Sequence, residues 1–201
     1  MGLEYRVLED SDVQNASECI ARAFSTNDVL SIALGIGLED WRKFAKQETL
    51  KSIDDGLSIG AFDEDKLVGV SLVCDLAKYN SEGYNEIESF VPIYNLLNEL
   101  SRGYEMKGRI AHASLLGVMP KYTDNPRVAV RIIKDSVGLI RSEGYDKIVG
   151  EMTSPYAQMV TRLAGFRAIN EISYKDFIYK GEKIFKGIIN AKSCMLMELK
   201  L

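Results

Sequence analysis

The segment Arg109–Val118 (RIAHASLLGV) most constrains the fold, because it is apolar on both faces of an expected strand. Such a strand is typical of the middle of a sheet that helices cover on each side. A short turn follows, and an amphipathic helix pattern begins at Pro126 and ends near Glu143, before the helix-terminating Gly144. The sequence therefore predicts a central strand, a turn and a long helix in direct succession.

The remaining apolar patterns predict further elements on both sides of this unit. Alternating residues predict strands over 4–9, 57–62, 67–76, 145–152, 167–177 and 193–201, with a polar loop at 80–85. Helical spacing predicts helices over 39–52 and 154–166, one over 86–106 broken near Pro92, and one beginning at the capping-box pattern Ser11–Gln14. Residues 25–37 are expected to form a turn and a short segment closed by glycines. This order predicts one α+β domain over residues 1–201, with a mixed central sheet of about six to seven strands flanked by helices.

The composition is that of an ordinary globular protein, since 46% of the 201 residues are hydrophobic and 27% are charged. A formal net charge of −4 argues against a nucleic-acid or membrane-surface partner, and no apolar run approaches the length that spans a bilayer. The acidic N-terminus does not resemble a signal peptide, and three scattered cysteines suit a reducing, cytoplasmic location. No spacing of Cys and His suggests a metal site.

The turn after the central strand is the first candidate for a ligand site. The N-terminus of a helix carries unpaired amides and a partial positive charge, so it can bind a phosphate. This turn lacks the glycines that allow close approach, while Asp124 repels anions, Pro126 removes one donor and Val128 crowds the approach. Either the anion site is retained but weakened, or Asn125 simply caps a core helix that holds no ligand.

The order of these elements resembles the GCN5-related N-acetyltransferase (GNAT) superfamily over nearly the whole chain. Val118, Pro120 and Tyr122 match the start of its acyl-CoA signature, Val-x-Pro-x-Tyr-Arg-Gly-x-Gly-x-Gly/Ala. The chain departs from the rest of that signature, where the basic and small residues are replaced by Thr123, Asp124, Pro126 and Val128.

Within the superfamily, the chain is most similar to the invertebrate arylalkylamine (dopamine-type) N-acetyltransferases. The similarity is carried by segments in a common order and spacing: FSTNDVLSIALG, SIDDGLSIGAFD with KLVGVSL, YAQMVTRLAGF, and YKDF with GEKIF and AKSCMLMELKL. The resemblance implies an enzyme that uses acetyl-CoA. Its main-chain contacts to the pantetheine arm and the thioester would come from Leu116, Gly117, Val118 and Met119. Its pyrophosphate contacts would come from Asp124, Asn125, Arg127, Val128 and Ala129.

Two residues are candidates for the base that removes a proton from the attacking amine. His112 is the only histidine, and an ordinary histidine pKa of about 6.5 suits this role. Strand alternation predicts that it shares a face with Ser114, Leu116 and Val118, and vertebrate arylalkylamine acetyltransferases carry histidines at the places of His112 and Ser114. Asp28 stands where the invertebrate enzymes have a catalytic Glu. The alternatives are a hydrogen-bonded core histidine and an aspartate that only flanks a helix.

Ser154 and Tyr156 are candidates to protonate the leaving thiolate or to contact the cofactor, and Tyr156 is otherwise a core residue with its hydroxyl satisfied. The serine pair of the invertebrate enzymes falls on Thr153 and Ala157, and the usual general-acid tyrosine falls on Thr161, so neither is complete. Glu151 is either an amine ligand or a surface charge.

The resulting hypothesis is transfer of an acetyl group from acetyl-CoA to a primary amine by direct attack, with a water-linked base. The acceptor is expected to be a small arylalkylamine or polyamine-like molecule, and the enzyme a monomer or homodimer. Trp41, Phe44 and the segment FVPIYNLL either form the acceptor pocket or are core residues, as aromatic residues at helical spacing usually are. The alternatives are a non-catalytic acyl-CoA sensor and a peptide or protein N-acetyltransferase with an open groove.

Overall fold

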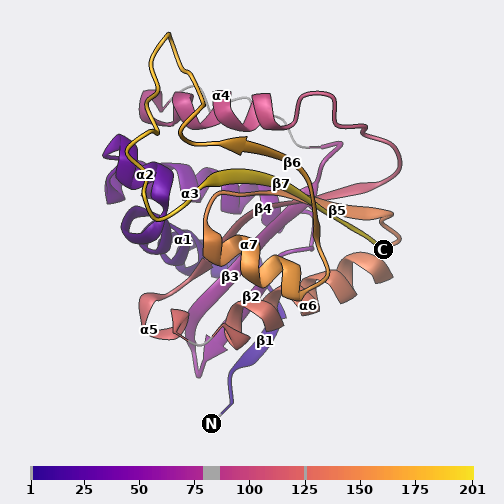
Figure 1. Ribbon diagram of the computed structural model, residues 1–201. Coiled ribbons are helices and arrows are strands. Elements are labelled where there is room, and N and C mark those ends of the chain that lie inside the picture. The colour runs from indigo at the N-terminus through magenta and orange to yellow at the C-terminus, as the bar shows by residue number, and fades with distance from the viewer. Residues whose placement is uncertain (1, 79–86, 125) are drawn as a thin grey trace.

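Figure 1 shows a twisted sheet with helices on both of its faces. The computed structural model describes residues 2–78, 87–124 and 126–201. The sheet has seven strands in the order β1-β2-β3-β4-β5-β7-β6. Their bounds are Glu4–Val7 (β1), Ile59–Asp63 (β2), Lys66–Asp75 (β3), Ile110–Val118 (β4), Lys147–Met152 (β5), Arg167–Ser173 (β6) and Ser193–Lys200 (β7). The predicted α+β class, with a mixed sheet flanked by helices, is confirmed.

The two strands at the centre of the sheet, β4 and β5, pair with each other over a short stretch only. Among the described strands, β4 and β5 alone run parallel, and they pair only where Ile110–His112 lies opposite Lys147–Val149. Beyond His112, β4 continues beside β3, whereas β5 stays paired with β7. A gap therefore opens between the two central strands.

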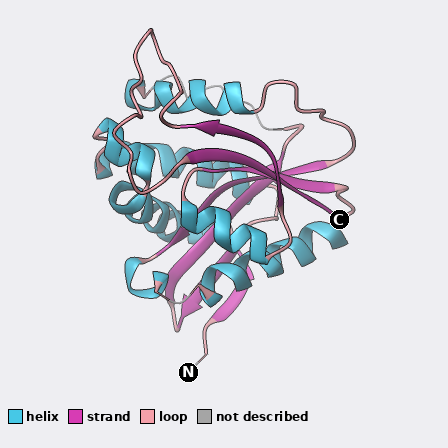
Figure 2. Ribbon diagram, in the orientation of Figure 1, coloured by secondary structure: helices cyan, strands magenta, loops and turns pink. Residues whose placement is uncertain are grey.

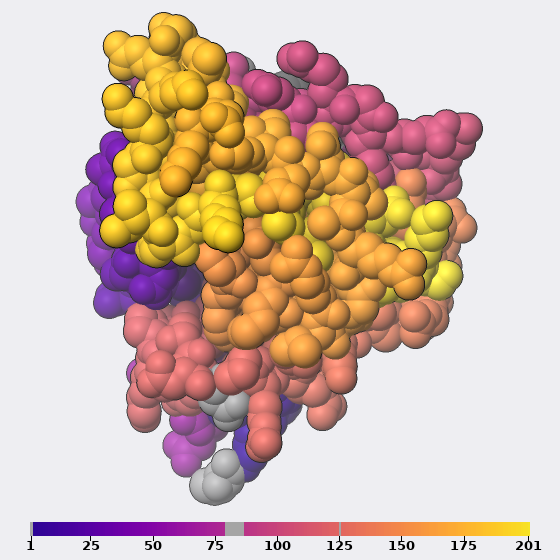
Figure 3. Space-filling view, in the orientation of Figure 1, coloured from indigo at the N-terminus to yellow at the C-terminus, as the bar shows by residue number. Residues whose placement is uncertain are grey.

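Helices cover both faces of the sheet (Figure 2), and each face has its own hydrophobic core. One face carries α1 (Val13–Asn27), α2 (Val29–Leu34), α3 (Leu38–Ile53) and α4 (Val91–Leu100), and the other carries α6 (Arg127–Ser142) and α7 (Pro155–Leu163). The amphipathic pattern after the central strand does form α6, and its buried residues lie three or four positions apart, as in Val128, Ile132 and Ile140. The space-filling view in Figure 3 shows how α7 and the C-terminal segments cover part of this assembly.

The N-terminal part of the chain contains more helix than its pattern predicts. The reciprocal cap lies at Glu9 and Asp12 around a short 3₁₀ turn, so the predicted capping box at Ser11–Gln14 is wrong, and α1 begins at Val13. The segment expected to be a turn instead holds the last residues of α1 and all of α2, which ends at Gly35 in a left-handed conformation.

Two prolines also act differently from the prediction. Pro92 lies in the first turn of α4, where its missing amide costs nothing, so it starts this helix instead of breaking one. Pro120 starts α5 (Pro120–Thr123), a single helical turn inserted between β4 and α6. The predicted loop at 80–85 and the predicted cap Asn125 lie outside the described residues.

A β-bulge at Ser114 changes which way the central strand presents its side chains. Leu72 pairs with Leu115 while the next residue, Val73, pairs with Ala113, so Ser114 is the extra residue. Alternation restarts after it: Ala113 and Leu116 both pack in the core under α6 and α7, whereas Leu115 packs in the other core. The prediction that His112 shares a face with Leu116 and Val118 is therefore wrong.

Gly150 in β5 limits how closely the central strands can approach each other. A Cβ placed there would lie 2.7 Å from the Ala113 carbonyl oxygen, a main-chain atom that cannot rotate away. We expect Gly150→Ala to lower the free energy of unfolding by about 1–3 kcal/mol, because it overpacks the joint. Urea unfolding followed by circular dichroism measures this change.

Gly138, an exposed residue of α6, is the matched control. A Cβ at Gly138 would meet no atom within 4 Å, so Gly138→Ala should raise the free energy of unfolding by about 0.5–1 kcal/mol through helix propensity. Equal effects of the two substitutions would contradict the close approach of β4 and β5.

Candidate active site

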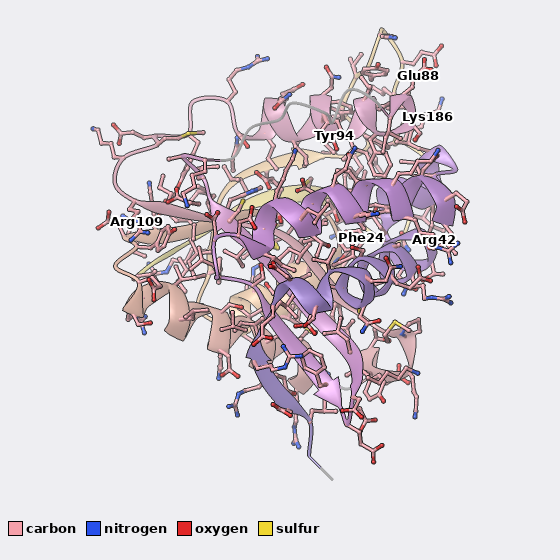
Figure 4. The ribbon with its side chains drawn as sticks, turned by 180° about the vertical axis from the view of Figure 1, so that it is seen from behind. Phe24, Arg42, Glu88, Tyr94, Arg109 and Lys186 are labelled. Carbon is pink, nitrogen blue, oxygen red and sulfur yellow. The ribbon has the colours of Figure 1, made fainter. Side chains whose placement is uncertain are left out.

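The gap between β4 and β5 opens into a cavity of about 140 Å³ that reaches both faces of the sheet. A dry cavity of about this size in a protein core holds a benzene molecule. Most of its wall is apolar or aromatic, with Phe24, Trp41, Phe44 and Tyr94 on the side of α1, α3 and α4. Figure 4 shows Phe24 and Tyr94 on separate helices of that side. The cavity therefore suits a small molecule with an apolar body, and Trp41 and Phe44, which are also core residues, line it.

A second hollow of about 90 Å³ lies beside the first, between the end of α1, the end of β4 and the start of α7. Phe24, Asp28 and Leu116 line both spaces. Tyr156 and Val118 line only the second one. The two hollows are thus neighbouring compartments that meet at Asp28.

Asp28 is buried at this meeting point and is held by several donors. As the N-cap of α2, its Oδ2 accepts hydrogen bonds from the Ser31 amide at 2.8 Å and the Ser31 hydroxyl at 2.7 Å. Its Oδ1 accepts one from the Thr153 hydroxyl at 3.0 Å, and Trp41 Nε1 donates to Ser31 Oγ at 2.9 Å. Burial raises the pKa of Asp28, and the bonds from Ser31 and Thr153 oppose that rise.

His112 forms a buried ion pair with Glu151. Its Nε2 lies 2.9 Å from Glu151 Oε2, across the point where β4 and β5 separate. Burial alone would lower the pKa of His112, but the Glu151 carboxylate and contacts with Cys74 raise it well above its ordinary value. Burial would raise the pKa of Glu151, yet the charge of His112 lowers it. The pairing with Glu151 therefore favours the imidazolium over the neutral histidine expected of a base, and Glu151 is no surface charge.

Glu48 is a cavity residue that the sequence did not single out. It projects from α3 into the cavity with only 2% of its surface exposed. Burial raises its pKa to about 7, and the positive charges of Lys51 and His112 oppose the rise. The one available signal was a glutamate at helical spacing from Trp41 and Phe44, on the apolar face of α3.

The two residues proposed for the leaving thiolate have different surroundings. Tyr156 Oη is buried against the second hollow and has no hydrogen-bond partner among the described residues. Ser154 is the N-cap of α7, where its Oγ accepts the Ala157 amide at 3.1 Å, and it lines neither hollow. The structure thus brings Tyr156 to the site but leaves Ser154 outside it.

Only some of the β4 residues expected to contact the pantetheine arm and the thioester have main-chain groups that face the gap. The Met119 amide donates to the Val68 carbonyl at 2.9 Å, so it is committed to β3. The backbone N–H and C=O groups of successive strand residues point to opposite edges of the strand. Those of Gly117 therefore also face β3, while those of Leu116 and Val118 face the gap. Gly117 instead permits close packing of α1, because a Cβ there would lie 2.9 Å from Ile20 Cδ1.

The side chains at the start of α6 do not favour phosphate binding. Pro126 is its N-cap and provides no side-chain hydrogen bond, and Asp124 is exposed beside it. Val128 and Ala129 turn their side chains into the core, so only the backbone amides of these two residues could face an anion. Arg127 is an exposed, positively charged residue in the first turn of α6.

The described residues contain no group of Asp, Glu, His and Cys side chains that could hold a metal ion. Within the same residues, no helix is both long and apolar enough to cross a membrane.

Known proteins are similar to this chain in structure but were not matched by sequence. No protein-family model and no curated protein sequence matches the chain. The arylalkylamine N-acetyltransferase 2 of Aedes aegypti superposes with a TM-score of 0.83 at 20% identity, over 100% of this chain and 99% of that one. The C-terminal condensation domain of Ebony, in complex with β-alanyl-dopamine, gives 0.88 at 16% identity, with 100% of both chains covered.

A polyamine N-acetyltransferase of Drosophila melanogaster gives a TM-score of 0.75 at 17% identity, over 99% of this chain and 100% of that one. These low identities and high structural scores agree with the resemblance carried by the sequence segments. The chain has the fold of the GCN5-related N-acetyltransferases, and arylalkylamine N-acetyltransferases are among its structural neighbours.

Proposed function

We propose that the protein transfers an acetyl group from acetyl-CoA to the primary amine of a small molecule. The observation that carries this proposal is the gap beyond His112, where the open edge of β4 meets a cavity that contains buried carboxylates. The strand edge can bind a thioester, and the cavity can bind an amine. An enclosed cavity with aromatic walls also favours a small acceptor over a peptide chain.

The donor arm would lie in the second hollow, along the open edge of β4. The main-chain groups of Leu116 and Val118 facing the gap would bind the pantetheine arm and polarise the thioester carbonyl. The buried Tyr156 hydroxyl, which has no partner among the described residues, fits a position beside the sulfur. The first-turn backbone of α6 would bind the diphosphate weakly, because Asp124 repels it.

Asp28 is the better candidate for the base, because it lies where the two hollows meet. An ammonium acceptor must lose a proton before it attacks, and Asp28 would take that proton through a water molecule. The amine nitrogen then bonds to the carbonyl carbon as the carbon–sulfur bond breaks. Tyr156 gives its proton to the leaving thiolate, and the second proton, which the new amide nitrogen releases, returns through water to the tyrosine oxygen. His112 is less suited to accept a proton, since its ion pair with Glu151 favours the imidazolium.

A second candidate function is transfer of an acyl group other than acetyl. The Ebony domain, which superposes with a TM-score of 0.88, is bound to a dopamine that carries a β-alanyl group. Thiol release from acetyl-CoA and from β-alanyl-CoA, measured with the same amine, separates the two functions.

Binding of acetyl-CoA should stabilise the protein, and amines should then release its thiol. At a hundredfold excess over the dissociation constant we expect a rise in Tm of about 5–10 °C. Thiol release on adding tryptamine, tyramine or spermidine is measured with a colorimetric thiol reagent. Stabilisation without release from any amine would favour the sensor, and release with a histone tail alone would favour the peptide enzyme.

Asp28→Asn tests the base while keeping the helix cap. Asparagine caps helices as well as aspartate does, so Tm should change little, whereas loss of the base should lower kcat by about 10²- to 10⁴-fold. Asp54→Asn, an exposed change at the C-terminal end of α3, is the control. Full kcat in Asp28→Asn together with its loss in His112→Gln would exchange the roles of the two residues.

The charge of His112 can be read directly by NMR, because the chain has a single histidine. We expect its imidazole to titrate well above its ordinary value and Glu151→Gln to lower that midpoint, since the carboxylate stabilises the imidazolium. The stability gained from this pair is complete below the unfolded pKa of about 6.5 and is lost as pH rises through the folded value. A midpoint at or below the ordinary histidine value would restore His112 as a base.

A further inference from the structure

Of the carboxylates that line the cavity, Glu48 has no role in the proposed reaction and is not the one paired with His112. Glu48 lines the cavity from α3 and is almost fully buried. Its Oε1 is shielded from solvent and accepts no hydrogen bond from the residues that the structure describes. A buried carboxylate oxygen without a donor is costly, and it favours a ligand that supplies one.

The surroundings of Glu48 suit a cation. Phe44 lies one helical turn before it on α3, and the Phe44 and Tyr94 rings lie 6.4 Å apart by their centroids. Both rings and Glu48 line the same cavity. Aromatic faces beside a carboxylate are a favourable setting for an ammonium or guanidinium group.

The cavity also has more acidic than basic side chains. Asp28, Glu48 and Glu151 line it, and His112 is the one basic residue among its lining residues in the described chain. Glu151 is matched by His112 at 2.9 Å. Asp28 has neutral donors only, and Glu48 has none at Oε1.

Asp28 and Glu48 occupy different places in the cavity wall. Asp28 lines both hollows and is joined to Trp41 through the Ser31 hydroxyl, with bonds of 2.7 and 2.9 Å. Glu48 lines the first cavity but not the second hollow, and it lies seven residues after Trp41 on α3, which is two turns, or about 10 Å along the helix axis. Asp28 is therefore next to the hollow proposed for the donor, whereas Glu48 is not.

We propose that Glu48 is a specificity-determining residue that binds a second basic group at the far end of the acceptor. The preferred acceptor is then a diamine-type molecule whose first amine reacts near Asp28 while its second stays protonated against Glu48, Phe44 and Tyr94. This inference rests on the proposed function, and it names the substrate class of that site.

The test compares two acceptors that differ only in the second amine. Cadaverine and pentylamine have the same carbon chain, so the ratio of their kcat/KM values isolates the distal group. A charge-assisted hydrogen bond is worth about 1.5–3 kcal/mol, so we expect cadaverine to be favoured about 10- to 100-fold. Glu48→Gln should reduce that ratio at least tenfold through KM, while kcat for phenethylamine stays within about threefold.

The pH dependence provides a second readout of the same contact. Binding of cadaverine should strengthen as pH rises through about 7, where Glu48 ionises. The charged or titratable groups around Glu48 are Lys51 on its own helix, Tyr94 on α4 and His112 on β4. Because Asp28 also has a raised pKa, the Gln variant is needed to show which carboxylate is responsible. In Glu48→Gln, only the part of the pH dependence of cadaverine binding that comes from Glu48 should disappear.

Calorimetry separates failure of this inference from failure of the proposed function. Cadaverine binding to the wild-type protein, weakened at least tenfold by Glu48→Gln but not by the exposed control Glu99→Gln, would support the inference even if no thiol is released. An unchanged cadaverine preference in a folded Glu48→Gln protein would overturn it. An equal loss of kcat on all acceptors, together with loss of the acidic limb of the profile of kcat against pH, would also overturn the inference, because it would make Glu48 the base.

Discussion

The short parallel pairing between β4 and β5 is the constraint on which the rest of the structure depends. Three residues from each strand hold the two parts of the sheet together, at Ile110–His112 and Lys147–Val149. A longer pairing would engage the backbone N–H and C=O groups at this edge of β4 in hydrogen bonds with β5. Because the pairing stops at His112, that edge is left for a ligand, and the gap leads into the cavity. Gly150 sets the minimum separation at this point.

The buried charges follow from the same gap. His112 and Glu151 lie where the strands part, and each makes the charged form of the other favourable. Burying a charge without a partner is expensive, so Glu48, whose pKa is raised to about 7, costs folding free energy as it ionises. Such a cost is common where a binding site is prepared for a group that only the ligand brings.

The sequence predicts the scaffold better than the site. The apolar central strand and the helix α6 have local patterns that survive in the structure. The bulge at Ser114 has no such signal, because it depends on the register of β3, and it reverses the face expected for Leu116. The partner of His112 lies 39 residues away in Glu151. Glu48 is hidden because a glutamate in an amphipathic helix usually faces water.

The central claim is that the β4 edge beyond His112 binds a thioester donor. The most direct measurement is amide hydrogen exchange at Leu116 and Val118, with and without saturating acetyl-CoA. The account predicts slower exchange at these two amides, while Met119, already bonded to Val68, changes little. Slower exchange elsewhere with no change at Leu116 and Val118, although acetyl-CoA is bound, would contradict it.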